Sequence, residues 1–133
     1  MPLKAEGMAH YLTPEQLGAL ERQLSERTSV LRNEIAAALR RSDSPGAAGL
    51  ANHLDEIDDE AVADLETSIE VAEIERDMRE LRRAKDALRR LGTPEFGICF
   101  DCAAEIPLAR LSAEPTATRC FACQTIAERM HAD

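Results

Sequence analysis

The chain has 133 residues, of which 16 are Lys or Arg and 25 are Asp or Glu, so its formal net charge is -9. This acidic balance argues against a protein that coats DNA, because non-specific affinity for phosphates comes mainly from Lys and Arg. No stretch approaches the ~18 apolar residues that span a bilayer. The N-terminal residues contain no apolar run of the signal-peptide kind, so we expect a cytoplasmic protein. Aromatic residues make up only 3% and charged residues 31%, a composition that indicates long, exposed helices.

A first helix is predicted from Pro14 to Arg41. Its start carries a capping box, in which Thr13 is the cap, Pro14 takes the first helical position and Gln16 closes the box. Leucine and isoleucine then recur at spacings of three, four and seven residues, which places them on one helical face. The segment 42–49 is rich in Ser, Gly and Pro and is predicted to be a plain helix breaker.

A second, longer helix is predicted from about Leu54 to Leu91. Its apolar residues first step by four and then close to a heptad, and Gly92 with Pro94 prevents continuation. Two amphipathic helices joined by a short turn, here at about 42–53, bury their apolar stripes most economically as an antiparallel hairpin. The alternative is an ordinary helical bundle, but the chain has no further helices of comparable length to complete one.

Charge is segregated along the second predicted helix. Residues 55–75 contain ten acids and no Lys or Arg, whereas residues 76–90 contain seven bases and three acids. A charge run is usually just a solvated face. In the hairpin, however, this segregation makes the turn end acidic and the base end basic.

The cysteines form two CxxC pairs, Cys99 with Cys102 and Cys120 with Cys123, separated by 17 residues. Two such pairs can place four thiolates tetrahedrally around one Zn²⁺. The alternatives are a redox pair and accidental buried cysteines. They fit less well, because no βαβ context surrounds either pair and disulfides are rare in the cytoplasm. Four protein ligands leave no open coordination position, so we expect one structural zinc and no catalysis at the metal.

The fold expected from these patterns is all-α. It comprises an N-terminal segment at 1–13, a coiled-coil hairpin at 14–92 and a zinc-finger module with a short terminal helix at 93–133. Thr116 or Thr118 is the expected cap of that terminal helix. Three side chains beside the cysteine pairs are expected to pack around the metal and give the module a core: Phe96, Phe100 and Phe121.

No residue pattern indicates an enzyme. The sequence has no Gly-rich phosphate loop, HExxH motif or nucleophile elbow. The three histidines, His10, His53 and His131, are scattered along the chain, and we expect each of them on the surface.

The C-terminal residues resemble the zinc finger of the DksA/TraR family. The resemblance rests on the string from Phe96 to Cys102, on Arg110-Leu111, on Pro115-Thr116-Ala117 and on the second cysteine pair with Gln124. The long helical hairpin before it agrees with the same family. The resemblance implies a bacterial transcription factor of the stringent response that binds RNA polymerase directly rather than DNA. Its coiled coil would enter the secondary channel and place an acidic tip near the catalytic centre, often together with the alarmone ppGpp.

The tip motif of the family, Asp-x-x-Asp-x-Ala, lies at the start of the second helix. One match of this sequence to the motif, shifted by one residue toward the N-terminus, uses Asp55 and Asp58. It keeps both aspartates of the motif but puts Glu60 where alanine is expected. In either match the carboxylates stand three residues apart, on one side of a helix. Acids favoured by the helix macrodipole are the structural alternative. The ungapped match, counted back from Cys99, gives the tip as Glu56, Asp59 and Ala61, with Glu56 in place of the first aspartate.

The resemblance also implies contacts to ppGpp, for which Arg76 and Arg83 fall at suitable positions. Glu114, however, stands before Pro115 where the DksA branch tends to have Arg, and Gln124 stands where that branch tends to have Lys. Losing two cations weakens a site for a highly charged anion. We therefore expect polymerase binding with weak or absent ppGpp dependence.

Two other functions compete with this interpretation. The main rival is a zinc-stapled coiled-coil adaptor that binds a protein partner without acting at the polymerase active centre. A nucleic-acid-binding zinc ribbon is disfavoured, because acids outnumber arginines around the cysteines. A hairpin that satisfies its own apolar stripe favours a monomer.

Overall fold

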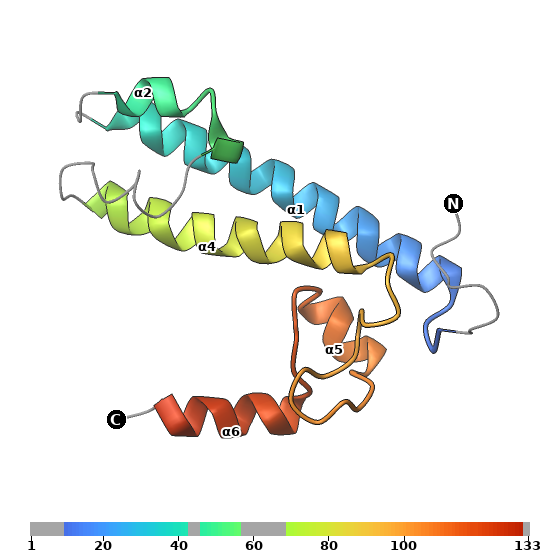
Figure 1. Cartoon of the computed structure of the whole chain (residues 1–133). Coiled ribbons are helices and arrows are strands. Elements are labelled where there is room, and N and C mark those ends of the chain that lie inside the picture. Colours follow the sequence, from blue (N-terminus) through green and yellow to red (C-terminus); the bar gives the residue numbers. More distant parts are fainter. Residues whose placement is uncertain (1–9, 43–45, 57–68, 132–133) are drawn as a thin grey trace. The chain divides into compact units, whose positions relative to one another are not determined.

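The computed structural model describes residues 10–42, 46–56 and 69–131. Most of these residues are helical, and Figure 1 shows the elements in chain order: α1 (Pro14–Arg41), α2 (Ala47–Leu50), the 3-10 turn η1 (Leu54–Glu56), α4 (Ile69–Arg90), α5 (Leu108–Ala113) and α6 (Phe121–His131). In these three stretches there is no strand, and one isolated bridge joins Ile98 to Glu105. The all-α prediction is confirmed. None of the described helices is long and apolar enough to cross a membrane.

Packing divides the chain into two compact units. Unit 1 comprises Met1–Ser25 and Ala84–Asp133, and unit 2 comprises Glu26–Arg83. Each unit therefore contains a part of α1 and a part of α4. These units are defined by packing in space, whereas the predicted boundaries at 13 and 92 follow the order of elements along the chain.

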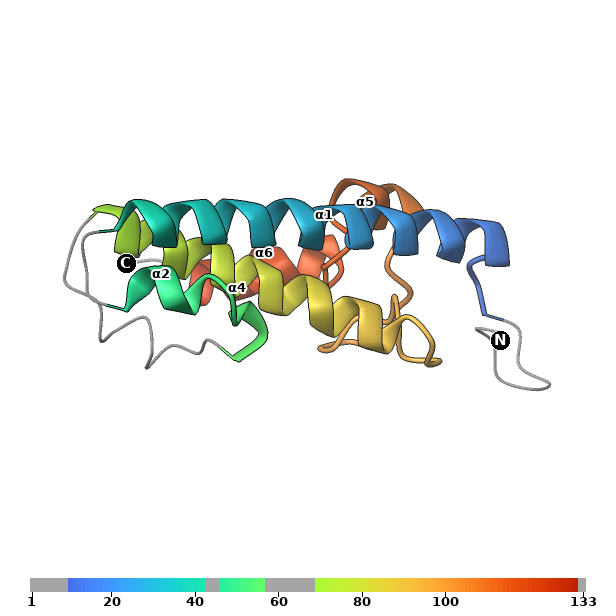
Figure 2. The same cartoon turned by 90° about the horizontal axis from the view of Figure 1, so that it is seen from above.

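Unit 2 is built on an antiparallel seam between α1 and α4, which run side by side in both views (Figures 1 and 2). The start of α1 belongs to the same unit as the last turns of α4, and the rest of α1 belongs to the same unit as the start of α4, so the two helices run in opposite directions. Within unit 2, Arg27 forms an ion pair with Glu80 through two hydrogen bonds of 2.6 and 2.9 Å. The seam is filled by apolar side chains that are at most 5% exposed: Leu31, Ile35, Leu39, Ile74, Met78 and Leu81. The apolar stripes predicted from residue spacing are thus buried against each other.

The segment that follows α1 is more structured than a plain turn. Ala47 and Ala51 are 0% and 6% exposed and pack against the seam, because their small side chains allow a close approach. Asp55 then lies 3.3 Å from Arg32, nine residues before the end of α1. That is about 13 Å back along the helix axis. The segment 42–49 therefore contains a helix, and residues 54–56 form a 3-10 turn rather than the first turn of a long helix.

Unit 1 packs the start of α1 and the last turns of α4 against the cysteine-bearing segment. The predicted capping box is present at the start of α1. The backbone N–H of Gln16 donates to Thr13 Oγ1 at 3.0 Å, and the backbone N–H of Thr13 donates to Gln16 Oε1 at 2.9 Å. The core of the unit consists of side chains at most 3% exposed, together with three alanines: Leu12, Leu17, Leu20, Leu24, Ala84, Ala87, Leu91, Phe96, Cys99, Ile106, Leu111 and Ala117.

The residues just before α1 anchor it to the cysteine-bearing segment. The Tyr11 hydroxyl donates to the Ile106 carbonyl at 2.6 Å and lies 3.0 Å from the Gly97 carbonyl. The ring of His10 lies 2.9 Å from the Phe96 carbonyl. Gly97 has φ +82°, and a Cβ there would collide with the Tyr11 hydroxyl, so this position requires glycine. This contact half-buries His10, so its ring is less exposed than that of a freely solvated surface residue.

Candidate metal centre

The four cysteine sulfurs lie within 4.8 Å of one another. The two pairs meet where the sulfur of Cys102 is 3.8 Å from that of Cys120. Four sulfurs bound at about 2.3 Å to one tetrahedral Zn²⁺ are about 3.8 Å apart, so this spacing fits zinc. All four cysteines are free, and the sulfurs are therefore available as ligands.

A tight turn brings the first pair together. The Ala103 amide donates to the Cys99 carbonyl at 2.9 Å, and the Cys99 amide donates to the Ala104 carbonyl at 2.8 Å. Ala103 adopts the left-handed region at φ 66°, which reverses the chain. Both sulfurs then lie on one side of the turn, as a shared metal requires.

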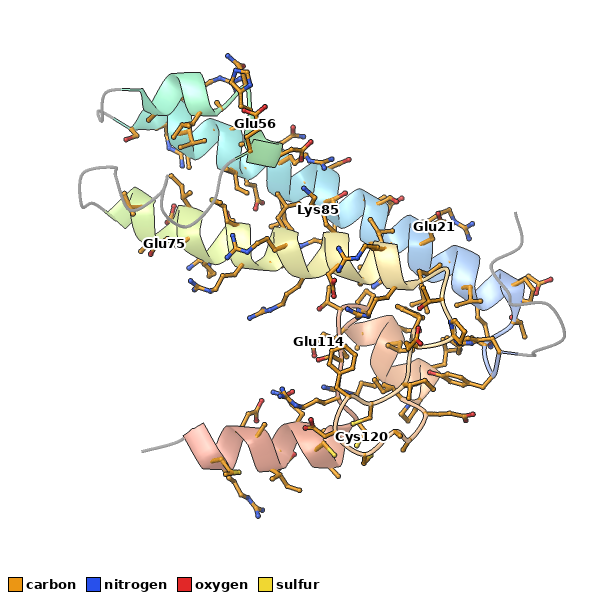
Figure 3. The ribbon with its side chains drawn as sticks, viewed as in Figure 1. Glu21, Glu56, Glu75, Lys85, Glu114 and Cys120 are labelled. Carbon is orange, nitrogen blue, oxygen red and sulfur yellow. The ribbon has the colours of Figure 1, made fainter. Side chains whose placement is uncertain are left out.

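The second pair lies at the start of α6, where Figure 3 labels Cys120. Cys120 immediately precedes Phe121, the first residue of α6, and its sulfur lies 3.5 Å from the Cys123 amide. The sulfur thus occupies the place of a helix cap. The expected caps, Thr116 and Thr118, stand too early in the chain. A thiol at position 120 can serve both the helix end and a metal.

The thiols differ in how readily they ionise. Burial opposes ionisation of Cys99, but backbone N–H groups of Cys120, Cys102 and Asp101 outweigh it and lower its pKa to about 6. Hydrogen bonding with Cys120, together with burial, raises the pKa of Cys123 to about 12. Like charges this close disfavour one another. A compensating cation favours deprotonation of the cluster, and a divalent ion bound by all four thiolates supplies that charge.

One of the three phenylalanines expected around the metal is buried. Phe96 is 0% exposed in the core of unit 1, whereas Phe100 and Phe121 are 61% and 73% exposed. The guanidinium of Arg90 lies 5.3 Å from the centre of the Phe100 ring, so this ring stacks with a cation on α4. The prediction that all three rings pack around the metal is wrong for Phe100 and Phe121.

The predicted tip residues lie in unit 2 or outside the described residues. Glu56 is the last residue of η1; its side chain is 77% exposed and lies 3.6 Å from the ring of His53. Figure 3 labels Glu56 beside α1. The neighbouring Asp55 is engaged with Arg32. Asp59 and Ala61 lie outside the residues that the structure describes.

The candidate anion contacts are exposed. Arg76 and Arg83 are both exposed on α4, and Arg76 lies 3.9 Å from the carboxylate of Asp77. In unit 1, Glu114 lies 3.7 Å from Arg110, and the Gln124 amide donates to Glu128 at 3.0 Å. Glu114 and Gln124, which stand at the two positions where cations are expected for anion binding, therefore supply no positive charge.

Residues 94–129 match the family model described as the prokaryotic DksA/TraR C4-type zinc finger, and this range contains all four cysteines. Two relatives carry the name RNA polymerase-binding transcription factor DksA, one from Escherichia coli (strain K12) and one from Salmonella typhimurium (strain LT2). Each is 28% identical over 127 residues, which are 96% of this chain and 81% of the relative. The factor of the same name from Haemophilus influenzae is 37% identical over 70 residues, 53% of this chain and 48% of the relative.

The fold is similar to that of a solved structure, the transcription factor DksA2 from Pseudomonas aeruginosa. The two superpose with a TM-score of 0.64 at 21% sequence identity, over 94% of this chain and 92% of the other. The four-cysteine geometry and the C4 match agree on one structural zinc.

Proposed function

We propose that this chain, whose residues 94–129 match the DksA/TraR C4-type zinc finger, regulates transcription by binding RNA polymerase directly. The observation that carries the proposal is the similarity to the polymerase-binding factors, which extends over 96% of this chain rather than over the zinc finger alone. The hairpin and the finger are therefore both part of the likeness.

The proposed mode of action is entry of the hairpin into the secondary channel of the polymerase, with the acidic tip near the active centre, where it modulates initiation. One observation and one chemical argument support an acidic tip. Residues 55–75 carry ten acids and no base. Carboxylates are ligands for Mg²⁺ and oppose phosphates, the two charged species of a nucleotidyl-transfer centre.

The proposed tip residues are Glu56, Asp59 and Ala61. Glu56 is taken over Asp55 as the first acid because it belongs to the ungapped match to the family motif. Both side chains are exposed, Glu56 at 77% and Asp55 at 69%, and each lies near a side chain of its own chain, His53 and Arg32 respectively.

Dependence on ppGpp is proposed to be weak or absent. Arg76 and Arg83 remain candidate contacts, but Arg76 has the carboxylate of Asp77 beside it. Glu114 and Gln124 supply no cation where the DksA branch tends to have two. A highly charged anion of this kind needs several converging positive charges.

The remaining features of the proposal concern the class of protein. It is a non-enzymatic, cytoplasmic regulator that acts as a monomer and has no sequence-specific contact with DNA. The four cysteines offer no open metal position for a substrate, and the net charge of -9 disfavours phosphate backbones. The alternative is an adaptor that docks on a protein partner without reaching the active centre.

The experiment that tests the proposal compares Asp59→Asn with Asp64→Asn, a control in the same acidic run. We expect Asp59→Asn to bind core polymerase like the parent protein but to lose its effect on purified promoter transcription, while Asp64→Asn keeps both. Normal regulation by Asp59→Asn would favour the adaptor. Absence of polymerase binding by the parent protein would reject the proposed partner. Adding ppGpp is expected to leave the effect of the parent protein nearly unchanged.

A further inference from the structure

An ion pair joins the two cysteine pairs outside the sulfur cluster. Arg119 donates through Nε to the carboxylate of Asp101 at 2.7 Å. Asp101 immediately precedes Cys102, and Arg119 immediately precedes Cys120. The ion pair therefore spans the same junction as these two sulfurs, which lie 3.8 Å apart.

Backbone contacts reinforce this junction from both sides. The Phe100 backbone N–H donates to the Thr118 carbonyl at 2.8 Å, which connects the first cysteine pair to the segment just before the second pair. Arg110 of α5 donates through Nε to the Arg119 carbonyl at 2.9 Å, and the side chain of Arg110 is only 19% exposed. Helix α5 is thus bound to the second pair, and the second pair is bound to the first.

We propose that Asp101 and Arg119 are positioning residues, which hold the two cysteine pairs at the separation that a tetrahedral zinc requires and thereby slow zinc release. Contacts outside the ligand shell commonly orient metal ligands in this way. The pair acts on neighbours of the ligands and does not itself touch the metal. This inference concerns the metal site alone and does not depend on the proposed function.

Removing the Asp101 side chain is expected to speed zinc release if the residue positions the ligands, and to slow zinc release if it acts only as a charge. Zinc held by four thiolates is a net anion, and its formation releases thiol protons. A carboxylate nearby, acting as a charge alone, opposes zinc retention, whereas the Arg119 cation favours it. If the two side chains form a brace instead, loss of either one accelerates release.

The test is the rate of zinc transfer from the full-length, zinc-loaded protein to an excess of a chromogenic chelator. The side chains of Arg119 and Asp101 are 38% and 47% exposed, so the effect is that of an accessible pair. We expect Asp101→Ala and Arg119→Ala each to release zinc roughly two- to fivefold faster. The double variant is expected to be no faster than the faster single variant, because both remove the same interaction. The charge-swapped double variant, Asp101→Arg with Arg119→Asp, is expected to recover most of the loss.

Glu95→Ala is the matched control, since Glu95 is another exposed acid of unit 1, and it should release zinc at the parent rate. Slower release from Asp101→Ala together with faster release from Arg119→Ala would assign the pair a purely electrostatic effect and overturn the proposal. Parent-like rates in both single variants would overturn it as well. Far-UV circular dichroism verifies the fold of each variant. If Asp101→Ala does not fold, Asp101→Asn replaces it. This variant keeps an acceptor oxygen for Arg119 and is expected to release zinc at a rate between that of the parent protein and that of Arg119→Ala.

Discussion

The two units use the same two helices but are held together by different forces. Unit 2 buries a seam of Leu, Ile, Met and Ala side chains between α1 and α4. Unit 1 contains all the aromatic residues of the chain and depends on short loops, long-range hydrogen bonds and four cysteines: Tyr11, Phe96, Phe100 and Phe121 are its aromatics. The four candidate zinc ligands all belong to unit 1, whereas unit 2 is packed around apolar side chains. Each unit should therefore respond to its own kind of perturbation.

The largest expected effect is the loss of zinc, for example in Cys99→Ser. Structural zinc contributes about 10–16 kcal/mol of binding free energy at neutral pH, which is also folding free energy for the residues it orders. We predict zinc content falling from about one ion per chain to a small fraction, and faster amide hydrogen exchange in residues 96–124. Residues 27–40 and 71–82 should keep most of their protection.

Two results of that experiment would contradict the comparison. One is retention of stoichiometric zinc by Cys99→Ser under dialysis against a chelator. The other is equal loss of protection in both units, which would mean that the seam of unit 2 depends on the metal too.

The next effect is a cavity in the seam of unit 2, made by Ile74→Ala. Ile74 is 0% exposed, and removing its side chain is expected to cost about 2–5 kcal/mol of unfolding free energy. Denaturant unfolding followed by circular dichroism measures the loss, and metal analysis should still find one zinc. Val30→Ala is the control, because Val30 is 43% exposed on α1 and should change stability little. A loss of zinc in Ile74→Ala would mean that zinc binding in unit 1 depends on the packing of unit 2.

The smallest effect concerns the anchor of unit 1. Tyr11→Phe removes a hydroxyl that donates to the Ile106 carbonyl, and a cost of about 1–2 kcal/mol is expected at pH 8. Burial and the Glu105 carboxylate raise the pKa of Tyr11 from 10.0 to about 12. Because the folded pKa is the higher one, this contribution is complete below pH 10 and is lost as the pH rises through 12.

The corresponding measurement is the unfolding free energy of unit 1 as a function of pH. The parent protein should lose stability between pH 10 and 12, and Tyr11→Phe should show a flatter profile over this range. Identical profiles would mean that the Tyr11 hydroxyl has the same environment in the folded and unfolded chain.

The sequence predicted those parts of the fold that local rules govern. The first helix begins at Pro14 and ends at Arg41 as expected, because its capping box and apolar spacing are local signals. The four metal-binding cysteines could be predicted as well, since two CxxC pairs in a helical chain have few functions other than metal binding. The segregated charges, too, could be read directly from the order of residues.

Contacts between distant residues explain what the sequence did not predict. Helix α5 has only six residues and begins after Pro107 without a side-chain cap, so it carries no local start signal. The return of Asp55 to Arg32 joins residues 23 positions apart, and that of His10 to Phe96 joins residues 86 positions apart. Propensity and spacing within one element contain no information about such pairs.

Site-specific cross-linking from the proposed acidic tip to RNA polymerase tests the proposed function most directly. A photo-cross-linking side chain in place of Glu60 is incorporated into the full-length, zinc-loaded protein, which is then mixed with core polymerase. We expect cross-links to polymerase segments beside the catalytic Mg²⁺, abolished by an excess of the unmodified protein. Binding to polymerase with cross-links only to its outer surface would overturn the proposed mode of action and favour the adaptor.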